Sequence, residues 1–244
     1  MDKYGLVGYP LGHSFSRDFF NEKFKNEGIN AEYVNFEIPS IERFPEIITE
    51  NANLCGLNVT IPYKEKIIPY MNELSEEARH IGAVNVVRIG MRKGKPHLKG
   101  FNSDVIGFTR SIEPIHRKAL ILGTGGASKA VRYGLHRLGI ETRFVSRNPK
   151  EDSLTYPQLT PEIMDEYKVI VNCTPVGMYP HTEECPALPY TAIGRNHLLY
   201  DLVYNPEETL FLRKGREQGA ITKNGLEMLI LQAYAGWEFW HSED

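Results

Sequence analysis

The chain has 244 residues, of which 41% are hydrophobic and 24% charged, and its formal net charge is −3. This length predicts one or two domains with a sizeable core, and the charge argues against a nucleic-acid surface or a polybasic membrane anchor. No apolar stretch reaches the roughly 18–20 residues that span a bilayer, and Cys55, Cys173 and Cys185 lack metal-ligand spacing. We therefore expect a cytoplasmic protein with free thiols and no metal site.

Apolar strand-like runs alternate with helical patterns over the first hundred residues. The expected strands are 4–8, 32–38, 54–61 and the two arms of a hairpin, 84–89 and 96–100. The expected helices are 15–27, 41–50 and 75–81. A turn at 100–103 ends this part of the chain, so we place a domain boundary after residue 102.

The alternation continues in the second half. The expected helices are 104–112, 127–138, 207–214 and 226–240, and the expected strands are 118–122, 141–146, 169–172, 197–202 and 220–222. The segments 148–160 and 178–189 are each expected to be a loop or a weak helix. This order predicts an α/β fold with mostly parallel sheets covered on both faces. The last helix is apolar on several faces and carries both tryptophans. We expect it to dock on the first domain, which would comprise 1–102 and 226–244, while 103–225 form the second.

A glycine-rich turn, Gly123-Thr124-Gly125-Gly126-Ala127-Ser128, follows the buried strand 118–122 and opens a helix. Strand, tight glycine turn and helix N-terminus together are the context of a dinucleotide fingerprint, so a Rossmann-type domain is predicted. The glycines let the backbone approach a pyrophosphate, and the helix N-terminus offers N–H groups and partial positive charge. Ser128 is expected to add a hydroxyl donor. A turn that only joins strand to helix is the alternative.

The end of the next strand favours one cofactor. An NAD site places an acidic residue there to accept a hydrogen bond from the ribose 2′-hydroxyl. Here the residues are Ser146, Arg147 and Asn148, all hydrogen-bond donors. Because a guanidinium suits a 2′-phosphate, we predict NADP rather than NAD. The alternative is that Arg147 is a solvated surface charge.

Polar residues also lie at strand ends in the first half. Lys64 comes just after the strand 54–61, close to Thr60, where its ammonium can exchange a proton with a substrate oxygen. Ser14 and Ser16 lie at the start of the first helix, where hydroxyl and N–H groups can hold a carboxylate. A snorkelling surface lysine and simple helix capping by a serine are the alternatives.

Motifs occur in a specific order along the chain. They are Gly-Tyr-Pro-Leu-Gly-His-Ser-Phe-Ser at 8–16, Asn-Val-Thr-Ile-Pro-Tyr-Lys at 58–64, Gly-Ala-Val-Asn at 82–85, Asn-Ser-Asp at 102–104, Asn-Cys-Thr-Pro-Val-Gly-Met at 172–178, Asp-Leu-Val-Tyr-Asn-Pro at 201–206 and Asn-Gly-Leu-Glu-Met-Leu-Ile-Leu-Gln-Ala at 224–233. With the glycine turn at 123–127, this set resembles the shikimate dehydrogenases along the whole chain.

The resemblance implies reversible reduction of 3-dehydroshikimate to shikimate by NADPH, in the biosynthesis of chorismate and aromatic amino acids. It implies that a set of polar residues contacts the substrate, namely Ser14, Ser16, Thr60, Asn85, Tyr204 and Gln232. It places Lys64 and Asp104 at the reacting oxygen. Cofactor contacts are implied for Gly123, Gly125, Gly126, Ala127, Ser128, Ser146, Arg147, Asn148, Thr174 and Gly225.

Some positions depart from the family pattern, and alternatives stay open. Arg17 stands where proline is usual, and Ser146 stands where asparagine is usual. A quinate/shikimate dehydrogenase with broader substrate or cofactor use is one alternative, and a non-catalytic dinucleotide-binding sensor is another. The expected partner is a small-molecule substrate rather than nucleic acid or membrane, and the protein is expected to be a monomer or homodimer.

Overall fold

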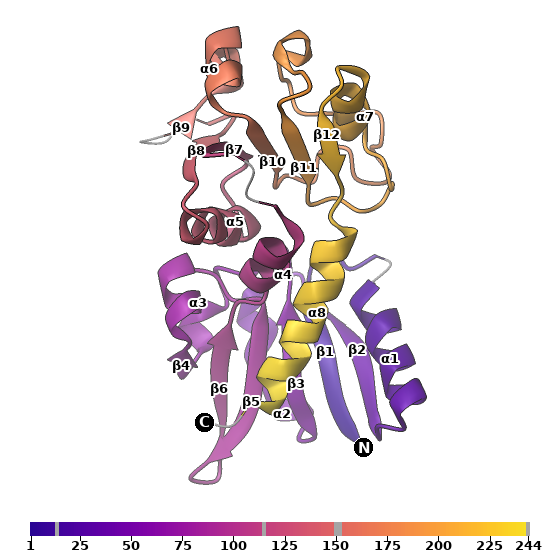
Figure 1. Ribbon diagram of the computed structural model, residues 1–244. Coiled ribbons are helices and arrows are strands. Elements are labelled where there is room, and N and C mark those ends of the chain that lie inside the picture. Colours follow the sequence, from indigo (N-terminus) through magenta and orange to yellow (C-terminus); the bar gives the residue numbers. More distant parts are fainter. Residues whose placement is uncertain (13–14, 114–115, 149–152, 243–244) are drawn as a thin grey trace. The chain divides into compact units, whose positions relative to one another are not determined.

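The computed structural model describes residues 1–12, 15–113, 116–148 and 153–242 (Figure 1). The chain divides into two compact units, which we describe separately. Unit 1 comprises residues 1–103 and 233–244, and unit 2 comprises residues 104–232. The sequence analysis placed the corresponding boundaries after residues 102 and 225. The division in the structure falls instead within the last helix, α8 (Leu226–His241), which contributes residues to both units.

Unit 1 alternates strands and helices and then ends in a hairpin. Its strands are β1 (Asp2–Gly8), β2 (Ala31–Glu37), β3 (Leu54–Val59), β4 (Glu73–Leu74), β5 (Val86–Arg92) and β6 (Lys95–Phe101). Its helices, apart from the second half of α8, are α1 (Phe15–Glu27), α2 (Phe44–Glu50) and α3 (Glu76–Ile81). The expected helix 41–50 is split, because a 3₁₀ turn (Ile41–Arg43) precedes α2.

The sheet of unit 1 has the strand order β2-β1-β3-β5-β6-β4. β1 lies parallel to β2 and β3, whereas β5 runs antiparallel to β3 and β6. Since β5 is antiparallel to its neighbours, the carboxyl ends of β1, β3 and β6 meet the start of β5 at one edge of the sheet. This edge carries the polar motifs of the first half.

Hydrophobic side chains cover both faces of this sheet. Val7 and Leu57 point to a cluster with Phe44 and Ile47 of α2. Tyr4 and Leu6, on the opposite face of β1, pack with residues of α1 and α8, namely Phe20, Phe24, Ala233 and Trp240. The alternation along β1 follows from the two-residue period of a strand. The second half of α8 therefore docks on unit 1, as the sequence predicted (Figure 1).

Unit 2 is a succession of strands and helices. Its strands are β7 (Lys118–Leu122), β8 (Glu141–Val145), β9 (Ser153–Leu154), β10 (Val169–Asn172), β11 (Leu198–Asp201) and β12 (Ile221–Lys223). Its helices, apart from the start of α8, are α4 (Asp104–Ser111), α5 (Gly126–Arg137), α6 (Pro161–Glu166) and α7 (Leu210–Glu217).

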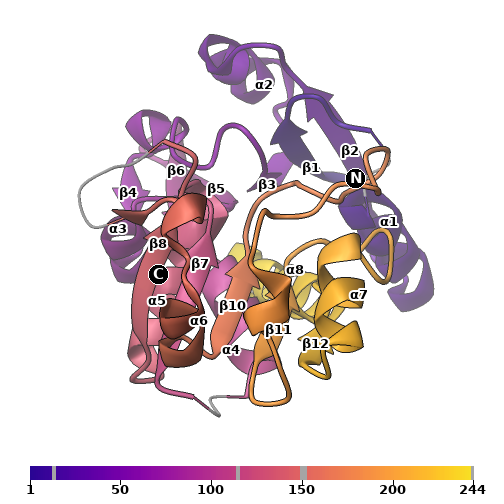
Figure 2. The same cartoon turned by 90° about the horizontal axis from the view of Figure 1, so that it is seen from above.

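The sheet of unit 2 is parallel throughout its described strands, in the order β12-β11-β10-β7-β8-β9. Figure 2 shows β12, β11, β10, β7 and β8 in this order. Parallel strands place all their carboxyl ends at one edge. Ala119 and Ile121 pack with Val131 and Leu135 of α5 on one face. Leu120 and Leu122 lie on the other face, in a cluster with residues of α6 and α7, Met164, Phe211 and Leu212.

Local capping explains where the elements differ from expectation. α7 begins at Leu210 rather than at residue 207, because the Thr209 hydroxyl accepts a hydrogen bond from the backbone N–H of Leu212 and caps the helix. α6 was not expected, although Thr160 followed by Pro161 is a helix-start pattern.

Within the described ranges, no helix is both long and apolar enough to cross a membrane.

Candidate functional site

Backbone hydrogen bonds bring Thr60, Lys64 and Asn85 to the polar edge of the first sheet. The N–H of Thr60 donates to the carbonyl of Val7 at 2.9 Å, so Thr60 continues beside the end of β1. The N–H of Val84 donates to the Lys64 carbonyl at 2.7 Å, and the N–H of Val59 donates to the Asn85 carbonyl at 2.9 Å. Thr60 therefore directly follows β3, Lys64 lies in the turn after it, and Asn85 directly precedes β5.

Lys64 lies half-buried in the turn that follows β3. Its neighbour Tyr63 is buried, and the Tyr63 hydroxyl donates to the carbonyl of Ile38 at 2.6 Å. The Tyr63 N–H also donates to the carbonyl of Thr60 at 2.9 Å. These contacts, together with the bond from Val84, fix the backbone on both sides of the lysine. The ammonium therefore extends from a rigid turn rather than from a free loop.

Asn85 and Ser103 exchange hydrogen bonds in the buried part of this edge. The Asn85 Nδ2 donates to Ser103 Oγ at 3.0 Å, and the Ser103 N–H donates to Asn85 Oδ1 at 2.7 Å. Asn102 adds a bond from its Nδ2 to the carbonyl of Ala83 at 3.0 Å. The segment that immediately precedes Asp104 is thereby fastened to the start of β5. Asp104 itself is the first residue of α4 and is only 5% exposed.

A buried chain of hydrogen bonds connects Tyr33 with Asn85. The Tyr33 hydroxyl donates to Asn58 Oδ1 at 2.8 Å, and Asn58 Nδ2 donates to the Asn85 carbonyl at 3.3 Å. Since an amide oxygen can only accept, the Tyr33 hydroxyl donates its proton to Asn58. Burial raises the pKa of Tyr33, so the phenol stays neutral. Ser14 lies outside the described residues.

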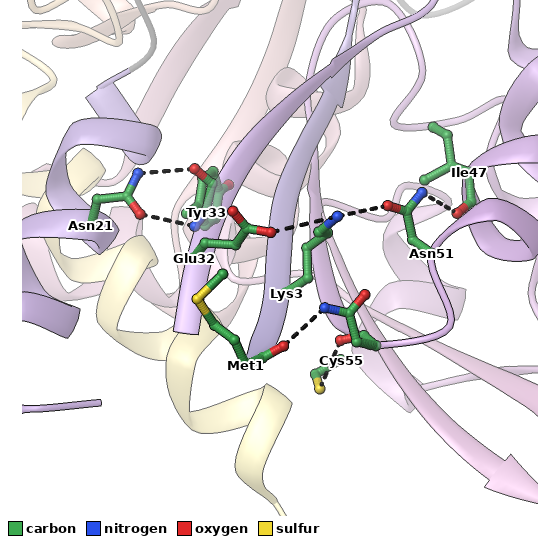
Figure 3. A network of polar contacts seen from close by, with 9 residues as sticks. Met1, Lys3, Asn21, Glu32, Tyr33, Ile47, Asn51 and Cys55 are labelled. Atoms are coloured by element: carbon green, nitrogen blue, oxygen red, sulfur yellow. Dashed lines mark hydrogen bonds and ion pairs between the residues drawn. The ribbon is translucent and has the colours of Figure 1, made fainter. Parts of the chain in front are cut away.

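Asn21 of α1 holds the backbone of Tyr33. Its Nδ2 donates to the Tyr33 carbonyl and its Oδ1 accepts from the Tyr33 N–H, both at 2.9 Å (Figure 3). The ring of Tyr33 also stacks on Phe20 with centroids 5.0 Å apart. α1 and β2 are therefore joined at the turn of α1 that follows the one with Ser16.

In unit 2, the glycine turn brings Gly123 against Thr174. The N–H of Gly123 donates to the Val145 carbonyl at 2.9 Å. Gly123 has φ of 101°, and a Cβ placed there would lie 3.0 Å from Thr174 Cγ2. A side chain at this position is disfavoured by both its backbone conformation and its close neighbour. The end of β7 thus lies next to the loop after β10, as a dinucleotide turn requires.

The start of α5 is open to an anion. Gly125 is exposed and serves as N-cap without a side-chain cap hydrogen bond, and a Cβ there would meet open space. Gly126 and Ala127, the first residues of α5, are half-buried. The N–H groups at this helix start suit a pyrophosphate. These positions fit a dinucleotide by the chemistry of their backbone donors.

Ser128 differs from the expected hydroxyl donor. It is fully buried, and its Oγ donates to the Gly125 carbonyl at 2.7 Å. The hydroxyl therefore stabilises the turn and is directed away from solvent. A serine at the third helical position can bond back to its own N-cap, and a contact of Ser128 with the cofactor stays a prediction.

Ser146, Arg147 and Asn148 follow β8. The Ser146 N–H donates to the Leu154 carbonyl at 2.9 Å, and Ser146 Oγ accepts from the Asn148 N–H at 3.2 Å. The side chains of Arg147 and Asn148 are exposed. The serine therefore shapes the turn, and the guanidinium beside it remains accessible to a phosphate.

Thr174, Tyr204 and Gly225 lie after the ends of β10, β11 and β12. The Leu202 N–H donates to the Asn172 carbonyl at 3.0 Å, and the Gly225 N–H donates to the Val203 carbonyl at 3.2 Å. A Cβ at Gly225 would lie 2.1 Å from the Leu202 carbonyl oxygen, so only glycine fits there. Burial raises the pKa of Tyr204, which keeps its phenol protonated.

Gln232 is a buried residue of α8. Its Nε2 donates to the carbonyl of Leu229 at 2.9 Å, one turn earlier in the helix. Gln232 therefore lies in a helix, whereas Thr174 and Tyr204 lie in loops that follow strand ends.

Sequence reasoning missed the buried polar residues that hold these loops. Asp201 at the end of β11 accepts hydrogen bonds from Asn172, Val203 and Thr209. Tyr33 and Asn58 play a similar part in unit 1. A signal existed for Asp201, because a carboxylate directly after an apolar strand needs a partner if the strand is buried. Tyr33 carries no such signal, since tyrosine is common in strands.

Comparisons with known proteins match both units. The model of the shikimate dehydrogenase substrate-binding domain matches residues 6–87, which all lie in unit 1. A shikimate dehydrogenase (NADP(+)) of Halothermothrix orenii is 41% identical, over 97% of this chain and 89% of that protein. One from Caldicellulosiruptor saccharolyticus is 36% identical, over 98% of this chain and 92% of that protein. The chain belongs to the shikimate dehydrogenase family.

The fold of this chain is similar to those of solved shikimate dehydrogenase structures. The shikimate 5-dehydrogenase of Thermus thermophilus, in complex with NADP(H) and shikimate, has a TM-score of 0.85 at 30% identity. The match covers 99% of this chain and 94% of that one. The α/β fold with a substrate-binding and a dinucleotide-binding part is therefore that of the shikimate dehydrogenases, as the resemblance implied.

Proposed function

We propose that this chain is a cytoplasmic, NADP-dependent shikimate dehydrogenase that interconverts 3-dehydroshikimate and shikimate in the biosynthesis of aromatic amino acids. The observation that carries the proposal is that relatives with this activity in their names match both units at 36–41% identity. Unit 1 supplies the polar edge for the substrate, and unit 2 supplies the glycine turn and α5 for the dinucleotide.

The proposed dinucleotide site lies in unit 2. The backbone N–H groups of Gly125, Gly126 and Ala127 hold the pyrophosphate at the start of α5. Arg147 pairs with the 2′-phosphate, and this charge-assisted contact favours NADP over NAD. Ser146 and Asn148 shape the turn that presents Arg147. The nicotinamide half of the cofactor is contacted by residues that follow strand ends, namely Gly123, Thr174 and Gly225. When it is bound, the cofactor supplies or accepts the hydride.

The polar edge of unit 1 provides most of the proposed substrate contacts. Ser14 and Ser16 at the start of α1 bind the substrate carboxylate. Thr60 and Asn85 hold ring hydroxyls, and Tyr204 and Gln232 of unit 2 provide further contacts. Substrate recognition of this kind depends on many directional bonds, so a compound that lacks one of the hydroxyls leaves a buried polar group unpaired.

Lys64 and Asp104 carry the proton chemistry. Reduction of a ketone builds negative charge on its oxygen, which needs a proton and a nearby positive charge. The ammonium of Lys64 provides both, and the carboxylate of Asp104 orients it. In the reverse direction, the same pair accepts the proton of the shikimate hydroxyl as the hydride leaves. The partner of the protein is thus a small molecule, and the enzyme acts as a monomer or homodimer.

A spectrophotometric assay at 340 nm tests the proposal. The purified chain is mixed with shikimate or quinate and with NADP⁺ or NAD⁺, at catalytic enzyme concentrations. The expected result is turnover with shikimate and NADP⁺ that exceeds the other combinations. Absence of turnover with shikimate would overturn the proposal, and preferred oxidation of quinate or preferred use of NAD⁺ would replace it with the broader dehydrogenase.

A further inference from the structure

Asp201 is a fully buried carboxylate at the carboxyl end of β11. Its Oδ1 accepts from Asn172 Nδ2 and from the backbone N–H of Val203, both at 3.0 Å. Its Oδ2 accepts from Thr209 Oγ1 at 2.6 Å. A buried charge is retained only where such donors compensate for lost hydration. Because the side chain has no solvent-exposed surface, it contacts its neighbours rather than a ligand.

Asp201 determines which way the amide of Asn172 faces. A carboxylate only accepts hydrogen bonds, so Asn172 must turn its Nδ2 toward Asp201. Its Oδ1 is then left to accept from the N–H of Thr174 at 3.1 Å and from the Thr174 hydroxyl at 2.6 Å. The Thr174 Oγ1 in turn accepts from the N–H of Val176 at 3.3 Å. The loop after β10 is therefore held by an amide whose orientation Asp201 sets.

The same carboxylate holds the loop after β11. The N–H of Val203 donates to Asp201, and the Val203 carbonyl accepts from the N–H of Gly225 at 3.2 Å. The two peptide groups on either side of the Val203 Cα are thereby each held by a hydrogen bond, immediately before Tyr204. Thr209 forms a third connection, since its hydroxyl donates to Asp201 and also caps α7. This third contact leads to a helix that carries none of the proposed ligand contacts.

We propose that Asp201 is a positioning residue that sets the Thr174 loop and the Tyr204 turn together, and so couples binding of the nicotinamide half of the cofactor to binding of the substrate. The inference rests on the proposed function, which assigns Thr174 to the cofactor and Tyr204 to the substrate. It adds a residue that touches neither ligand. A purely structural carboxylate would affect folding alone, whereas a positioning carboxylate affects both Michaelis constants.

The contacts of Asp201 can be removed separately. Asp201→Ala removes every contact, and Thr209→Val removes the connection to α7. Asn172→Leu removes the connection to the Thr174 loop, including the bond from Asn172 Nδ2 to the Val176 carbonyl. All are compared with the wild type for kcat, for the KM values of shikimate and NADP⁺, for NADPH affinity by fluorescence titration and for melting temperature. Glu208→Gln serves as a control for charge, because Glu208 is exposed and pairs with Arg216 at 2.6 Å.

The expected result is a split between activity and stability. Asp201→Ala should raise both KM values and lower kcat by at least about tenfold, as expected for misplaced binding groups. Asn172→Leu should raise the KM for NADP⁺ and weaken NADPH binding while leaving the KM for shikimate within about twofold. Thr209→Val should lower the melting temperature with kcat and both KM values within about twofold.

The proposal is overturned if Asp201→Ala and Thr209→Val lower the melting temperature alike and leave both KM values unchanged. If Asp201→Ala does not fold, Asn172→Leu decides instead, and unchanged NADPH affinity in that variant overturns the proposal. Failure of the proposed function is distinguishable, because the wild type would then show no turnover of shikimate. In that case the NADPH titration of Asn172→Leu still measures whether the Thr174 loop depends on this network.

Discussion

Asn85 and Ser103 are joined by reciprocal hydrogen bonds, in which Asn85 Nδ2 donates to Ser103 Oγ and Ser103 N–H donates to Asn85 Oδ1. Both residues are buried, with 3% and 0% of their surface exposed. We expect Asn85→Ala to lower the free energy of unfolding by about 2–3 kcal/mol, because it leaves buried donors and acceptors unpaired. It should also lower kcat/KM for shikimate by at least about tenfold, the equivalent of roughly 1.4 kcal/mol, with the KM for NADP⁺ unchanged. Ser103→Ala keeps its N–H bond, so an equal loss of stability in both variants would contradict this account.

Lys64 is predicted to be required for turnover. Lys64→Ala should reduce kcat on the order of 10²–10⁴-fold, the usual contribution of a positioned acid or base, while NADPH binding stays intact. Lys66→Ala is the matched control, because Lys66 lies exposed in the same turn and should retain kcat within about twofold. Steady-state kinetics and fluorescence titration measure the two effects. Near-wild-type turnover in Lys64→Ala would remove this lysine from the mechanism.

Arg147 is predicted to select the cofactor. Arg147→Ala should raise the KM for NADP⁺ by roughly 10–100-fold, because a charge-assisted contact contributes about 1.5–3 kcal/mol. The KM for NAD⁺ should change little, since NAD⁺ lacks the 2′-phosphate. The exposed Arg143 of β8 provides the control variant Arg143→Ala. If Arg147→Ala weakens both cofactors equally, the guanidinium does not read the 2′-phosphate.

The buried carboxylate of Asp201 predicts a pH dependence of stability. Burial raises its pKa from 3.8 to about 6, against the effect of its hydrogen-bond donors. The folded state therefore binds this proton more tightly than the unfolded chain does, so its contribution to stability falls as the pH rises from about 4 to about 6 and is constant above that.

Asp201→Asn tests this sign, because the amide does not titrate. Relative to the wild type, the variant should gain roughly 3 kcal/mol of unfolding free energy between pH 4 and pH 7, the amount that corresponds to such a change in pKa. Urea unfolding at several pH values measures the difference. Tyr190 also faces Asp201, and its pKa is raised by burial, so it stays neutral throughout this range. A difference that shrinks as the pH rises would refute the prediction.

Tyr33 is predicted to stabilise unit 1 through its hydroxyl. Tyr33→Phe leaves Asn58 Oδ1 buried without this donor and should cost about 1–3 kcal/mol of unfolding free energy. Tyr4→Phe is a suitable comparison in the same cluster, because the Tyr4 hydroxyl lies 3.4 Å from His241 Nε2, a long contact. That variant should lose less than about 1 kcal/mol. Equal losses would show that the bond to Asn58 contributes nothing specific.

The sequence predicted elements best where a strand is buried on both faces. The bounds of β7 and β10 agree with expectation, because a continuous apolar run flanked by turns has few other interpretations. The short strands β4 and β9 were missed, since two residues carry no periodicity. α7 was shifted because the position of its cap depends on Thr209, which also bonds to Asp201.

The candidate site was predicted as a set of residues rather than as an arrangement. Strand ends and helix starts gave the positions of Lys64 and Gly125, because parallel strands gather their ends at one edge, whereas Thr174 came only from the family resemblance. The Ser128 hydroxyl bonds locally to the carbonyl of Gly125, and the glycine-turn motif alone did not distinguish this bond from one to a phosphate. Asp201 was visible only as part of a motif, because burial on every side follows from loops that pack around it.

Unit 1 is assembled from the first 103 residues and from residues 233–244. Tyr4, Phe20 and Phe24 are synthesised early. Trp240, which shares their buried cluster, is added only after all of unit 2 has been synthesised. The part of the protein that is synthesised first is thus completed last. Until α8 emerges, this face of the first sheet is covered by α1 without Ala233 and Trp240, so part of its aromatic cluster lacks its native cover.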